Sequence, residues 1–449
     1  MSENKQSVDF RPPYLSLTDR QRREIKNRLE IENYSRLEED IPEELRNEYS
    51  ADFPADSEIE LRRWFKQQAG KNLSLAELTC FCGGGVYDHH VPSPVKDFLS
   101  RDGFLTSYTP YQPELNQGSL QAMYEFQSMI SELLRLPVTN ASMYDGATAL
   151  AEAAMMAVNV SRRDKIYYSP LLLPAWIEVL GTYAESLDWQ LQKLPVKGGR
   201  ARLPDSWGKE KPAAVCLGYP NRYGCADAVE EWSSARPDNK TVGIAGINPL
   251  AMALLEPPGR LDFDVAVGEG QPLGLPLNGG APGLGLFSAR EKFMRKMPGR
   301  LVGETTDRRG NRCYVLTLQT REQHIRRERA TSNICTNHAL MTVGVAVSLA
   351  SLGRKKLRRR ARINYERGCR LQRGFESAGF EVTGEPVFNE VAVDLAGQDT
   401  KDLNNKLAES GWLGGYSCGD RYVVAATEKR SPEEIDSFVN EVSRHVEPE

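Results

Sequence analysis

The residues best suited to bind an anion open an alanine-rich segment, Asp145-Gly146-Ala147-Thr148. Asp145 or Thr148 can cap a helix that begins here, and Gly146 lets the backbone come close to whatever lies beyond the helix end. The free N–H groups and positive dipole end of such a helix favour a phosphate or a carboxylate. Taken alone, this pattern more often marks an ordinary capped helix, because caps of this type are common.

A second group of candidate residues is basic: Arg321, His324, Arg326 and Arg327. Arginine presents a bidentate fork to carboxylates and phosphates, so these side chains are suited to hold an anion at a subunit contact. The alternative is a salt-bridged, solvent-facing start of a helix. The amide side chains crowded around this segment favour the interface role.

A loop with two tyrosines, residues 108–114, is the third candidate. Pro110 and Pro113 fix their own φ and favour extended conformations in the residues before them, which predicts an ordered loop. Tyr108 and Tyr111 can pack against a ring or an extended chain and donate a hydrogen bond. Alternatively, they fasten the loop to the core, since aromatic residues between prolines are frequently structural.

The elements that must position these residues follow from hydrophobic periodicity. Apolar residues at helical spacing predict a helix over 117–136 with a broad buried face. Beyond residue 140, short apolar strands near 165–168, 213–217, 241–245 and 263–267 alternate with segments predicted as helices, 145–159 and 227–235. This alternation predicts a mostly parallel α/β sheet buried on both faces. Ligands of such sheets collect beyond the carboxyl ends of the strands.

The two ends of the chain differ from this central part. Helices predicted over 16–50, with an end and restart at Pro42, and over 57–68 form a polar N-terminal helical arm, residues 1–75. The large α/β domain is predicted over 76–335. A small C-terminal α+β domain, 336–449, begins with a long helix over 337–378. The elements expected after it are strands 379–383, 390–394 and 421–426 and helices 400–410 and 432–445.

Composition excludes several classes of function. The 449 residues are 40% hydrophobic and 26% charged, and the net charge of -4 gives no reason to expect nucleic acid or an anionic membrane as a partner. The basic run 355–362 lacks interleaved aromatics and predicts a solvated or subunit-facing helix surface. No apolar run approaches the roughly 20 residues that span a bilayer, and no signal peptide is recognisable, so we expect a cytoplasmic protein.

Cysteine and histidine usage predicts no metal site. The eight cysteines are scattered, which favours reduced, mostly buried thiols. Adjacent histidines at 89 and 90 would point to opposite faces of a strand, so shared metal ligation is not expected.

Five separated motifs, in this order, carry a resemblance to a known family: FCGGGVYDHHVPSPV (81–95), YTPYQPELNQG (108–118), NASMYDGATALAEA (140–153), GEGQPLGLPLNGGAPGLG (268–285) and LTLQTREQHIRRERATSNICTN (316–337). The segment 108–153 looks like the entry to the cofactor domain of the aspartate-aminotransferase-like, fold type I pyridoxal-phosphate enzymes. More narrowly, the chain resembles the first, or alpha, subunit of the split form of the glycine-cleavage P-protein, from about residue 15 to the C-terminus.

The resemblance implies which residues should carry the chemistry, and two of them are absent. A pyridoxal-phosphate enzyme needs a lysine for the Schiff base and an acid facing the pyridinium nitrogen. In a catalytic relative the lysine would fall at Gln271, which cannot form an imine, and the acid would fall at Asn248, which is neutral. The resemblance therefore implies no catalytic residue in this chain, with pyridoxal phosphate carried by a partner beta subunit.

The implied reaction is decarboxylation of glycine on that cofactor, followed by transfer of the aminomethyl group to the lipoyl group of an H-protein. The implied assembly is a heterotetramer with the beta subunit. In it, Tyr108, Tyr111, Gln112 and Glu114 would line the partner's site, and Asp145, Gly146 and Thr148 would be a vestigial cofactor-binding helix end. Two alternatives remain open: a non-catalytic scaffold or regulatory relative, and a free-standing pyridoxal-phosphate lyase using another lysine.

Overall fold

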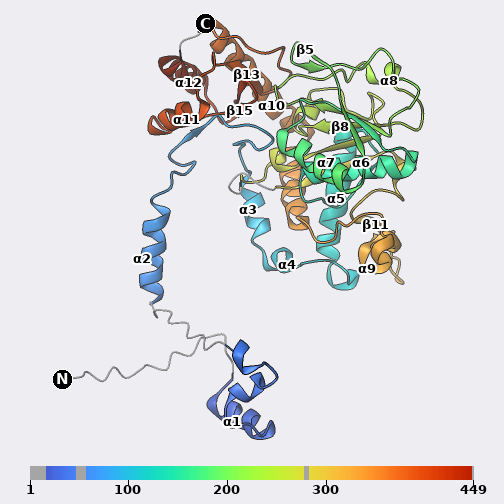
Figure 1. Ribbon diagram of the computed structural model, residues 1–449, viewed down its shortest axis with the longest axis vertical. Helices are drawn as coiled ribbons and strands as arrows, with labels where there is room; N and C mark the ends of the chain where they lie inside the picture. The colour runs from blue at the N-terminus through green and yellow to red at the C-terminus, as the bar shows by residue number, and fades with distance from the viewer. Residues whose placement is uncertain (1–16, 47–56, 278–282, 447–449) are drawn as a thin grey trace, which may run out of the picture. The chain divides into compact units, whose positions relative to one another are not determined.

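The computed structural model describes residues 17–46, 57–277 and 283–446, and the chain divides into two compact units, Met1–Asn72 and Leu73–Glu449 (Figure 1). The first unit contains α1 (Asp19–Arg28), two 3₁₀ turns (Tyr34–Glu38 and Glu43–Leu45) and α2 (Glu58–Ala69). Thr18 and Ser57 begin the two helices with capping boxes. Neither helix buries a residue, and Ile31 is the one buried hydrophobic residue among the described positions of this unit.

The predicted helix over 16–50 is wrong in its extent. α1 ends at Arg28, and Glu30 adopts a left-handed φ of 53°, which a continuing helix cannot accommodate. The predicted helix over 57–68 is confirmed by α2. Residues 1–16 and 47–56 of the predicted arm, and 278–282 of the glycine-rich motif, lie outside the described residues.

The second unit is built on a seven-stranded sheet with the order β2-β10-β9-β8-β7-β3-β4. Its strands are β2 (Val138–Thr139), β3 (Lys165–Tyr168), β4 (Gln190–Lys193), β7 (Ala214–Tyr219), β8 (Val242–Ile247), β9 (Val265–Glu269) and β10 (Gly285–Ala289). The five strands from β9 to β4 are parallel, and β10 runs antiparallel to both of its neighbours. The prediction of a mostly parallel, buried sheet is confirmed, since β7, β8 and β9 are buried at every residue.

Helices cover both faces of this sheet (Figure 1). α6 (Gly146–Ser161) and α7 (Pro174–Ser186) pack on one face together with Ala214 and Cys216 of β7. The other face carries α5 (Gln117–Leu134) and the first half of α10 (Ala339–Ser377), which pack with Val215 and Leu217. Successive side chains of β7 point to opposite faces of the sheet, so this strand contributes to the hydrophobic core on each face. The helix predicted over 117–136 is confirmed as α5.

The long helix predicted over 337–378 is observed as α10 (Ala339–Ser377), with one interruption. Gly353 lies inside it at φ 62° and ψ 171°, a conformation that favours glycine and breaks the helical hydrogen-bond ladder. The predicted helix over 227–235 shrinks to a single turn, α8 (Trp232–Ala235).

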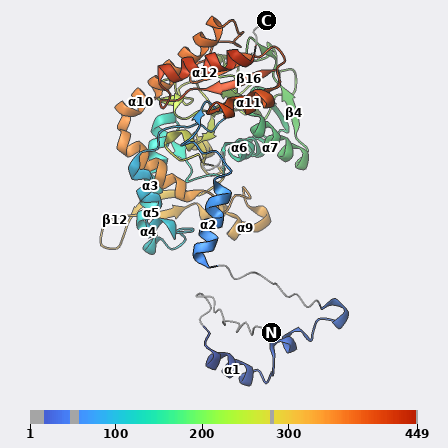
Figure 2. The same ribbon diagram turned by 90° about the vertical axis from the view of Figure 1, so that its left-hand side faces the viewer.

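The C-terminal part is a three-stranded antiparallel sheet covered by helices (Figure 2). Its strands are β13 (Glu390–Asp394), β15 (Tyr416–Cys418) and β16 (Arg421–Ala425), and α11 (Thr400–Glu409) and α12 (Pro432–His445) contribute to the same core as the end of α10. The predicted strand 379–383 is wrong, because only an isolated bridge joins Val382 to Val393. The predicted domain boundaries at 75 and 335 stay predictions.

The remaining elements are short. They are β1 (Thr79–Cys80), α3 (Ser93–Leu99), α4 (Asp102–Leu105), a 3₁₀ turn (Pro113–Leu115), β5 (Val196–Lys197), β6 (Arg200–Ala201), β11 (Leu301–Thr306), β12 (Arg312–Thr317), α9 (Gln323–Arg326) and β14 (Trp412–Leu413), with further 3₁₀ turns at Ala251–Ala253, Gln271–Leu273, Glu291–Phe293, Gln319–Arg321 and Arg327–Arg329. Within the described ranges, no helix combines the length and apolar character that crossing a membrane requires.

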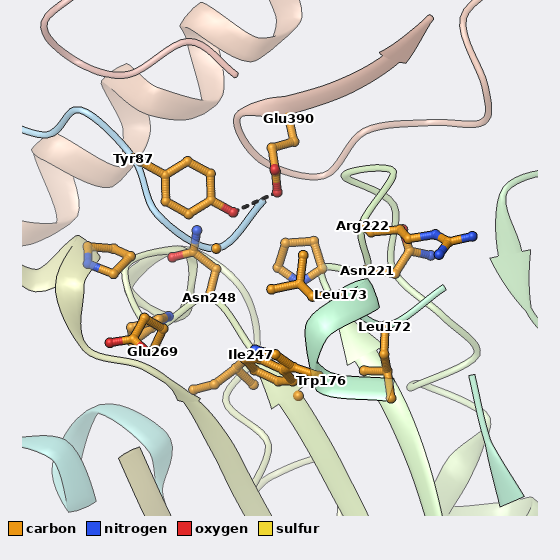
Figure 3. Close-up of a pocket in the computed structure, with 15 residues that line it drawn as sticks. Tyr87, Leu172, Leu173, Trp176, Asn221, Arg222, Ile247, Asn248, Glu269 and Glu390 are labelled. Carbon is orange, nitrogen blue, oxygen red and sulfur yellow. Dashed lines mark hydrogen bonds between the residues drawn. The ribbon is translucent and has the colours of Figure 1, made fainter. Parts of the chain in front are cut away.

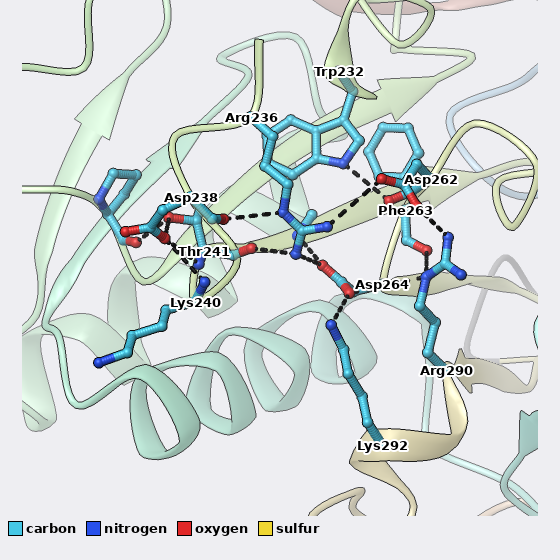
Figure 4. Close-up of polar contacts among 12 residues, drawn as sticks. Trp232, Arg236, Asp238, Lys240, Thr241, Asp262, Phe263, Asp264, Arg290 and Lys292 are labelled. Carbon is cyan, nitrogen blue, oxygen red and sulfur yellow. Dashed lines mark hydrogen bonds and ion pairs between the residues drawn. The ribbon is translucent and has the colours of Figure 1, made fainter. Parts of the chain in front are cut away.

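A buried ionic cluster fixes the amino ends of β8 and β9 (Figure 4). The fully buried Asp264 precedes β9 and accepts a 3.1 Å hydrogen bond from the Gly243 N–H of β8. The Arg236 guanidinium binds the same carboxylate, and Lys292 Nζ lies 2.9 Å from it. Because the cluster ties two adjacent strands together, it helps to set where their carboxyl ends fall.

Candidate functional site

The carboxyl ends of β7, β8 and β9 lie side by side and lead into loops that surround a small cavity (Figure 3). Its lining residues include Tyr87, Trp176, Asn248, Glu269 and Glu390. The cavity volume is about 30 Å³, which is room for a water molecule rather than for a cofactor, whose pockets are roughly 300 Å³ or larger.

Gln271, the residue at the expected lysine position, uses both its amide nitrogen and its amide oxygen in hydrogen bonds to the backbone. It is buried in the turn that follows β9, and its Nε2 donates to the carbonyl oxygens of Tyr87 at 2.9 Å and Leu275 at 3.0 Å. Its Oε1 accepts from the Tyr87 N–H at 3.0 Å. The Gln271 amide therefore joins the loop that carries Tyr87 to the turn at the carboxyl end of β9.

Asn248, the residue at the expected acid position, directly follows β8 and lines the cavity. Its Oδ1 accepts from the Leu250 N–H at 3.1 Å, while its buried Nδ2 has no hydrogen-bond partner among the described residues. A neutral amide cannot stabilise a protonated pyridine as a carboxylate does. With no amine at 271 and no acid at 248, these residues do not fit covalently held pyridoxal phosphate.

The glycine-rich loop 83–85 packs against a buried glutamate that sequence reasoning missed. Glu390 Oε1 accepts from the Gly84 N–H and Oε2 from the Tyr87 hydroxyl, both at 2.7 Å. A Cβ added to Gly83 would lie 2.5 Å from Glu390 Oε1, so this position needs glycine. Burial raises the pKa of the Glu390 carboxyl to about 7, against the two hydrogen bonds, which lower it. Glu390 is the first residue of β13, and nothing in the sequence predicts that its carboxyl is buried.

The start of α6 forms as the sequence predicts. Asp145 is the cap, and its Oδ1 accepts from the Thr148 N–H at 2.7 Å. Gly146 gives the close approach that its type suggests, since a Cβ there would lie 2.3 Å from Trp176 Cζ2. The nearest anion is internal: the Gly146 N–H donates to Glu269 Oε2 at 3.2 Å. Glu269 stands between two glycines in the sequence, and that spacing was the only signal for its role.

A second cavity, of about 370 Å³, adjoins the first and shares Gly85, Leu173, Trp176 and Glu269 with it. Asp145 and Ala147 at the start of α6 line this cavity from one side, and Tyr416 of β15 lines it from another. Residues from the start of α6 and from the three-stranded sheet therefore line the same cavity.

The structure brings the tyrosine loop and the basic segment together. The rings of Tyr111 and His324 have centroids 5.2 Å apart in an edge-on arrangement, and an Arg300 side-chain nitrogen lies 3.3 Å from the Tyr111 hydroxyl. The Tyr108 hydroxyl donates to Thr336 Oγ1 at 3.0 Å, although 76% of Tyr108 is exposed. The neighbouring side chains that the sequence singled out, Gln112, Glu114, Arg326 and Arg327, are also exposed.

Arg321 differs from the other predicted interface residues because it is buried. Its guanidinium donates to the carbonyl oxygens of Met297 and Gly299. Burial lowers its pKa from the ordinary arginine value. Its two terminal nitrogens thus hold the turn before β11, which places this side chain inside the fold rather than on a contact surface.

Comparison with known proteins identifies the family. Residues 12–442 match the family described as glycine cleavage system P-protein. The chain belongs to the glycine cleavage system P-protein family. Its relatives include the probable glycine dehydrogenase (decarboxylating) subunit 1 of Bacillus mycoides (strain KBAB4), 42% identical over 442 residues, and that of Bacillus cereus (strain B4264), 41% identical. Both matches cover 96% of this chain and 98% of the relative.

Solved structures agree with the P-protein family assignment. The crystal structure of glycine decarboxylase (P-protein) of the glycine cleavage system, in inhibitor-bound form, has a TM-score of 0.89 and 37% identity and covers 96% of this chain and 100% of that chain. A cysteine desulfurase from Thermococcus onnurineus NA1, with a TM-score of 0.62 and 18% identity, covers 85% of this chain and 98% of that chain and shows the fold alone. The expected fold type I architecture is confirmed.

Proposed function

We propose that this chain is the non-lysine-bearing subunit of a glycine-decarboxylating P-protein. It would act with a beta subunit that carries pyridoxal phosphate on a lysine, and together they would decarboxylate glycine and pass the aminomethyl group to a lipoylated H-protein. The observation that carries the proposal is the pair Asn248 and Gln271. These two amides follow β8 and β9, the adjacent strand ends where a catalytic member of the fold needs an acid and a lysine.

Family membership over residues 12–442 supports the glycine-cleavage part of the proposal. The names of the relatives, which contain "subunit 1", support a partner chain. We propose a heterotetramer of two such pairs. When bound to the partner, pyridoxal phosphate would supply an electron sink for the carbanion left by decarboxylation.

The residues that this chain would present to its partner are those of the exposed tyrosine loop. Tyr108 is 76% exposed and Leu115 is 79% exposed, and Ile325 beside His324 is also exposed. Exposed aromatic and aliphatic side chains next to arginines are typical of the centre of a protein contact. We propose that Tyr108, Tyr111, Gln112 and Glu114, with His324, Arg326 and Arg327, form this contact and border the partner's active site.

Reconstitution with a lysine-bearing partner tests the proposed function. The full-length chain, purified alone and treated with pyridoxal phosphate and borohydride, should carry no covalent cofactor and should not exchange glycine with bicarbonate. Mixing it with the partner and lipoylated H-protein should restore exchange. A borohydride-stable pyridoxyl group on this chain by mass spectrometry would overturn the proposal in favour of a free-standing lyase. No exchange with any lysine-bearing partner would favour a scaffold.

The contact surface has a matched control. Tyr108→Ala should weaken association with the partner about tenfold, since a buried aromatic anchor contributes more than about 1 kcal/mol. Tyr365→Ala removes the same side chain from the exposed surface of α10, where Tyr365 is 41% exposed, and should leave association unchanged. Equal dissociation constants for Tyr108→Ala and the unmodified chain would exclude the loop from the contact.

A further inference from the structure

We infer that the Glu269 side chain occupies the anion position at the start of α6 and thereby closes this chain to phosphorylated ligands. The inference deepens the proposed function, on which it rests for the expectation that pyridoxal phosphate binds the partner. In this inference, the Glu269 carboxylate takes the place that a ligand phosphate would occupy. Glu269 is then the residue that keeps pyridoxal phosphate out of this subunit.

The hydrogen bonds of α6 are the first observation. A helix start leaves unpaired N–H groups that bind phosphate when a ligand is present. Here the Gly146 N–H donates to Glu269 Oε2 at 3.2 Å, and the Thr148 N–H donates to Asp145 Oδ1 at 2.7 Å. Two carboxylates of the chain itself therefore take up the N–H groups on either side of Ala147.

The backbone holds Glu269 in this place. It is the last residue of β9 and pairs with Gly285 of the antiparallel strand β10. Its other oxygen, Oε1, accepts a short hydrogen bond from the Leu284 N–H. One buried carboxylate thus bridges the start of α6 and the approach to β10, and moving it aside would leave two buried N–H groups without their acceptor.

Space is the second observation. Trp176 covers Gly146 so closely that a Cβ there would lie 2.3 Å from the indole ring. A Cβ at Gly283 would lie 2.7 Å from Glu269 Oε1. Glu269 borders both the 30 Å³ and the 370 Å³ cavities, so it stands at the boundary between the strand ends and the more open space.

Charge acts in the same direction. In its ionised form, Glu269 would repel a phosphate brought to the Gly146 N–H, as would Asp145 beside it, because like charges at hydrogen-bond distance repel strongly when water is excluded. Within the described ranges Glu269 forms no ion pair with a lysine or arginine, so its acceptor oxygens are balanced by backbone N–H groups alone.

Titration of the isolated full-length chain with inorganic phosphate tests the inference. Phosphate is compared with chloride at equal ionic strength, using calorimetry and intrinsic tryptophan fluorescence, to which Trp176 contributes as one of six tryptophans. The unmodified chain should not bind. Glu269→Ala should gain a saturable phosphate site, with binding at least about tenfold tighter than the detection limit that the unmodified chain sets, because the Gly146 N–H loses its internal acceptor. Glu269→Gln keeps the volume and one acceptor oxygen, so it should gain less than Glu269→Ala.

Two further variants keep the result interpretable. Glu152→Ala removes an equally buried glutamate from the middle of α6 and should gain no phosphate site. If Glu269→Ala does not fold, as judged by thermal unfolding, Glu269→Asp is used instead, since the shorter side chain cannot reach both N–H groups. Phosphate binding by the unmodified chain, or none by any folded Glu269 variant, overturns the inference. Exchange activity with the partner plays no part in this assay, so the proposed function stands or falls separately.

Discussion

Replacing Glu390 with glutamine tests how much a buried, uncompensated carboxyl costs this fold. Glu390 is fully enclosed between the glycine-rich loop and the small sheet, and its two partners are the Gly84 N–H and the Tyr87 hydroxyl. No lysine or arginine within the described residues forms an ion pair with it. Glutamine has nearly the same volume and can keep one acceptor oxygen, while its amide can donate to the hydroxyl in place of accepting from it.

The expected magnitude follows from the pKa. Burial raises the pKa of Glu390 from an ordinary 4.5 to about 7, so the folded chain binds a proton more tightly than the unfolded chain. The favourable contribution of this group is present below pH 4.5 and is lost as the pH rises through 7. At 1.36 kcal/mol per pH unit, the loss is roughly 3 kcal/mol. Glu390→Gln should therefore be about 2 kcal/mol more stable than the unmodified chain at pH 8, after subtracting about 1 kcal/mol for a weaker hydrogen bond.

Urea unfolding between pH 5 and pH 8.5 measures this difference. The free energy of unfolding of the variant should fall less steeply with pH, and the two curves should cross. Burial also raises the pKa values of Glu152 and Glu269 to about 7, so part of the slope should remain. Glu385→Gln, at an exposed position five residues earlier, is the control and should follow the unmodified chain. Identical slopes for Glu390→Gln and the unmodified chain would refute the reasoning.

Two other stability changes follow from the packing. Gly146→Ala should destabilise the chain by roughly 1–3 kcal/mol, because the new methyl group would lie 2.3 Å from an indole ring atom. Gly181→Ala, in open space on α7, should stabilise the chain by up to about 1 kcal/mol. The two variants should shift Tm in opposite directions, and shifts of the same sign would contradict the packing argument. Arg236→Ala should cost about 3 kcal/mol, because it removes a partner from the fully buried Asp264, whereas Lys292→Ala, at a half-exposed side chain, should cost less than about 1 kcal/mol. Denaturant midpoints that fall equally in both variants would show that burial does not govern this cluster.

Local features were predictable because they depend on residues close together in the chain. The cap at Asp145 and the buried face of α5 both follow from rules that operate within one or two helical turns. The strand cores around 215, 244 and 266 were recognisable from short apolar runs, and their helical neighbours made a parallel sheet the expected arrangement. The break at Gly353 was not predicted, since leucine, arginine and lysine, which all favour helix, stand on either side of it.

Contacts between distant residues could not be predicted in the same way. Glu390 and Tyr87 are 303 residues apart, and Glu269 and Gly146 are 123 apart. The arginine at 321 looked like an exposed anion ligand, but the turn at 297–299 takes up its terminal nitrogens. Which polar group meets which depends on how the seven-stranded sheet, the loop 83–85 and the three-stranded sheet come together, and no local pattern encodes that.

The absence of a Schiff-base lysine and of a pyridinium-facing acid follows from residue types alone: positions 271 and 248 hold amides, and no folding can turn an amide into an amine or an acid. What takes the place of that chemistry depends on the folded chain. Folding places a buried carboxylate against the Gly146 N–H and an indole ring over that glycine, because packing distant segments together leaves each buried polar group in need of a partner.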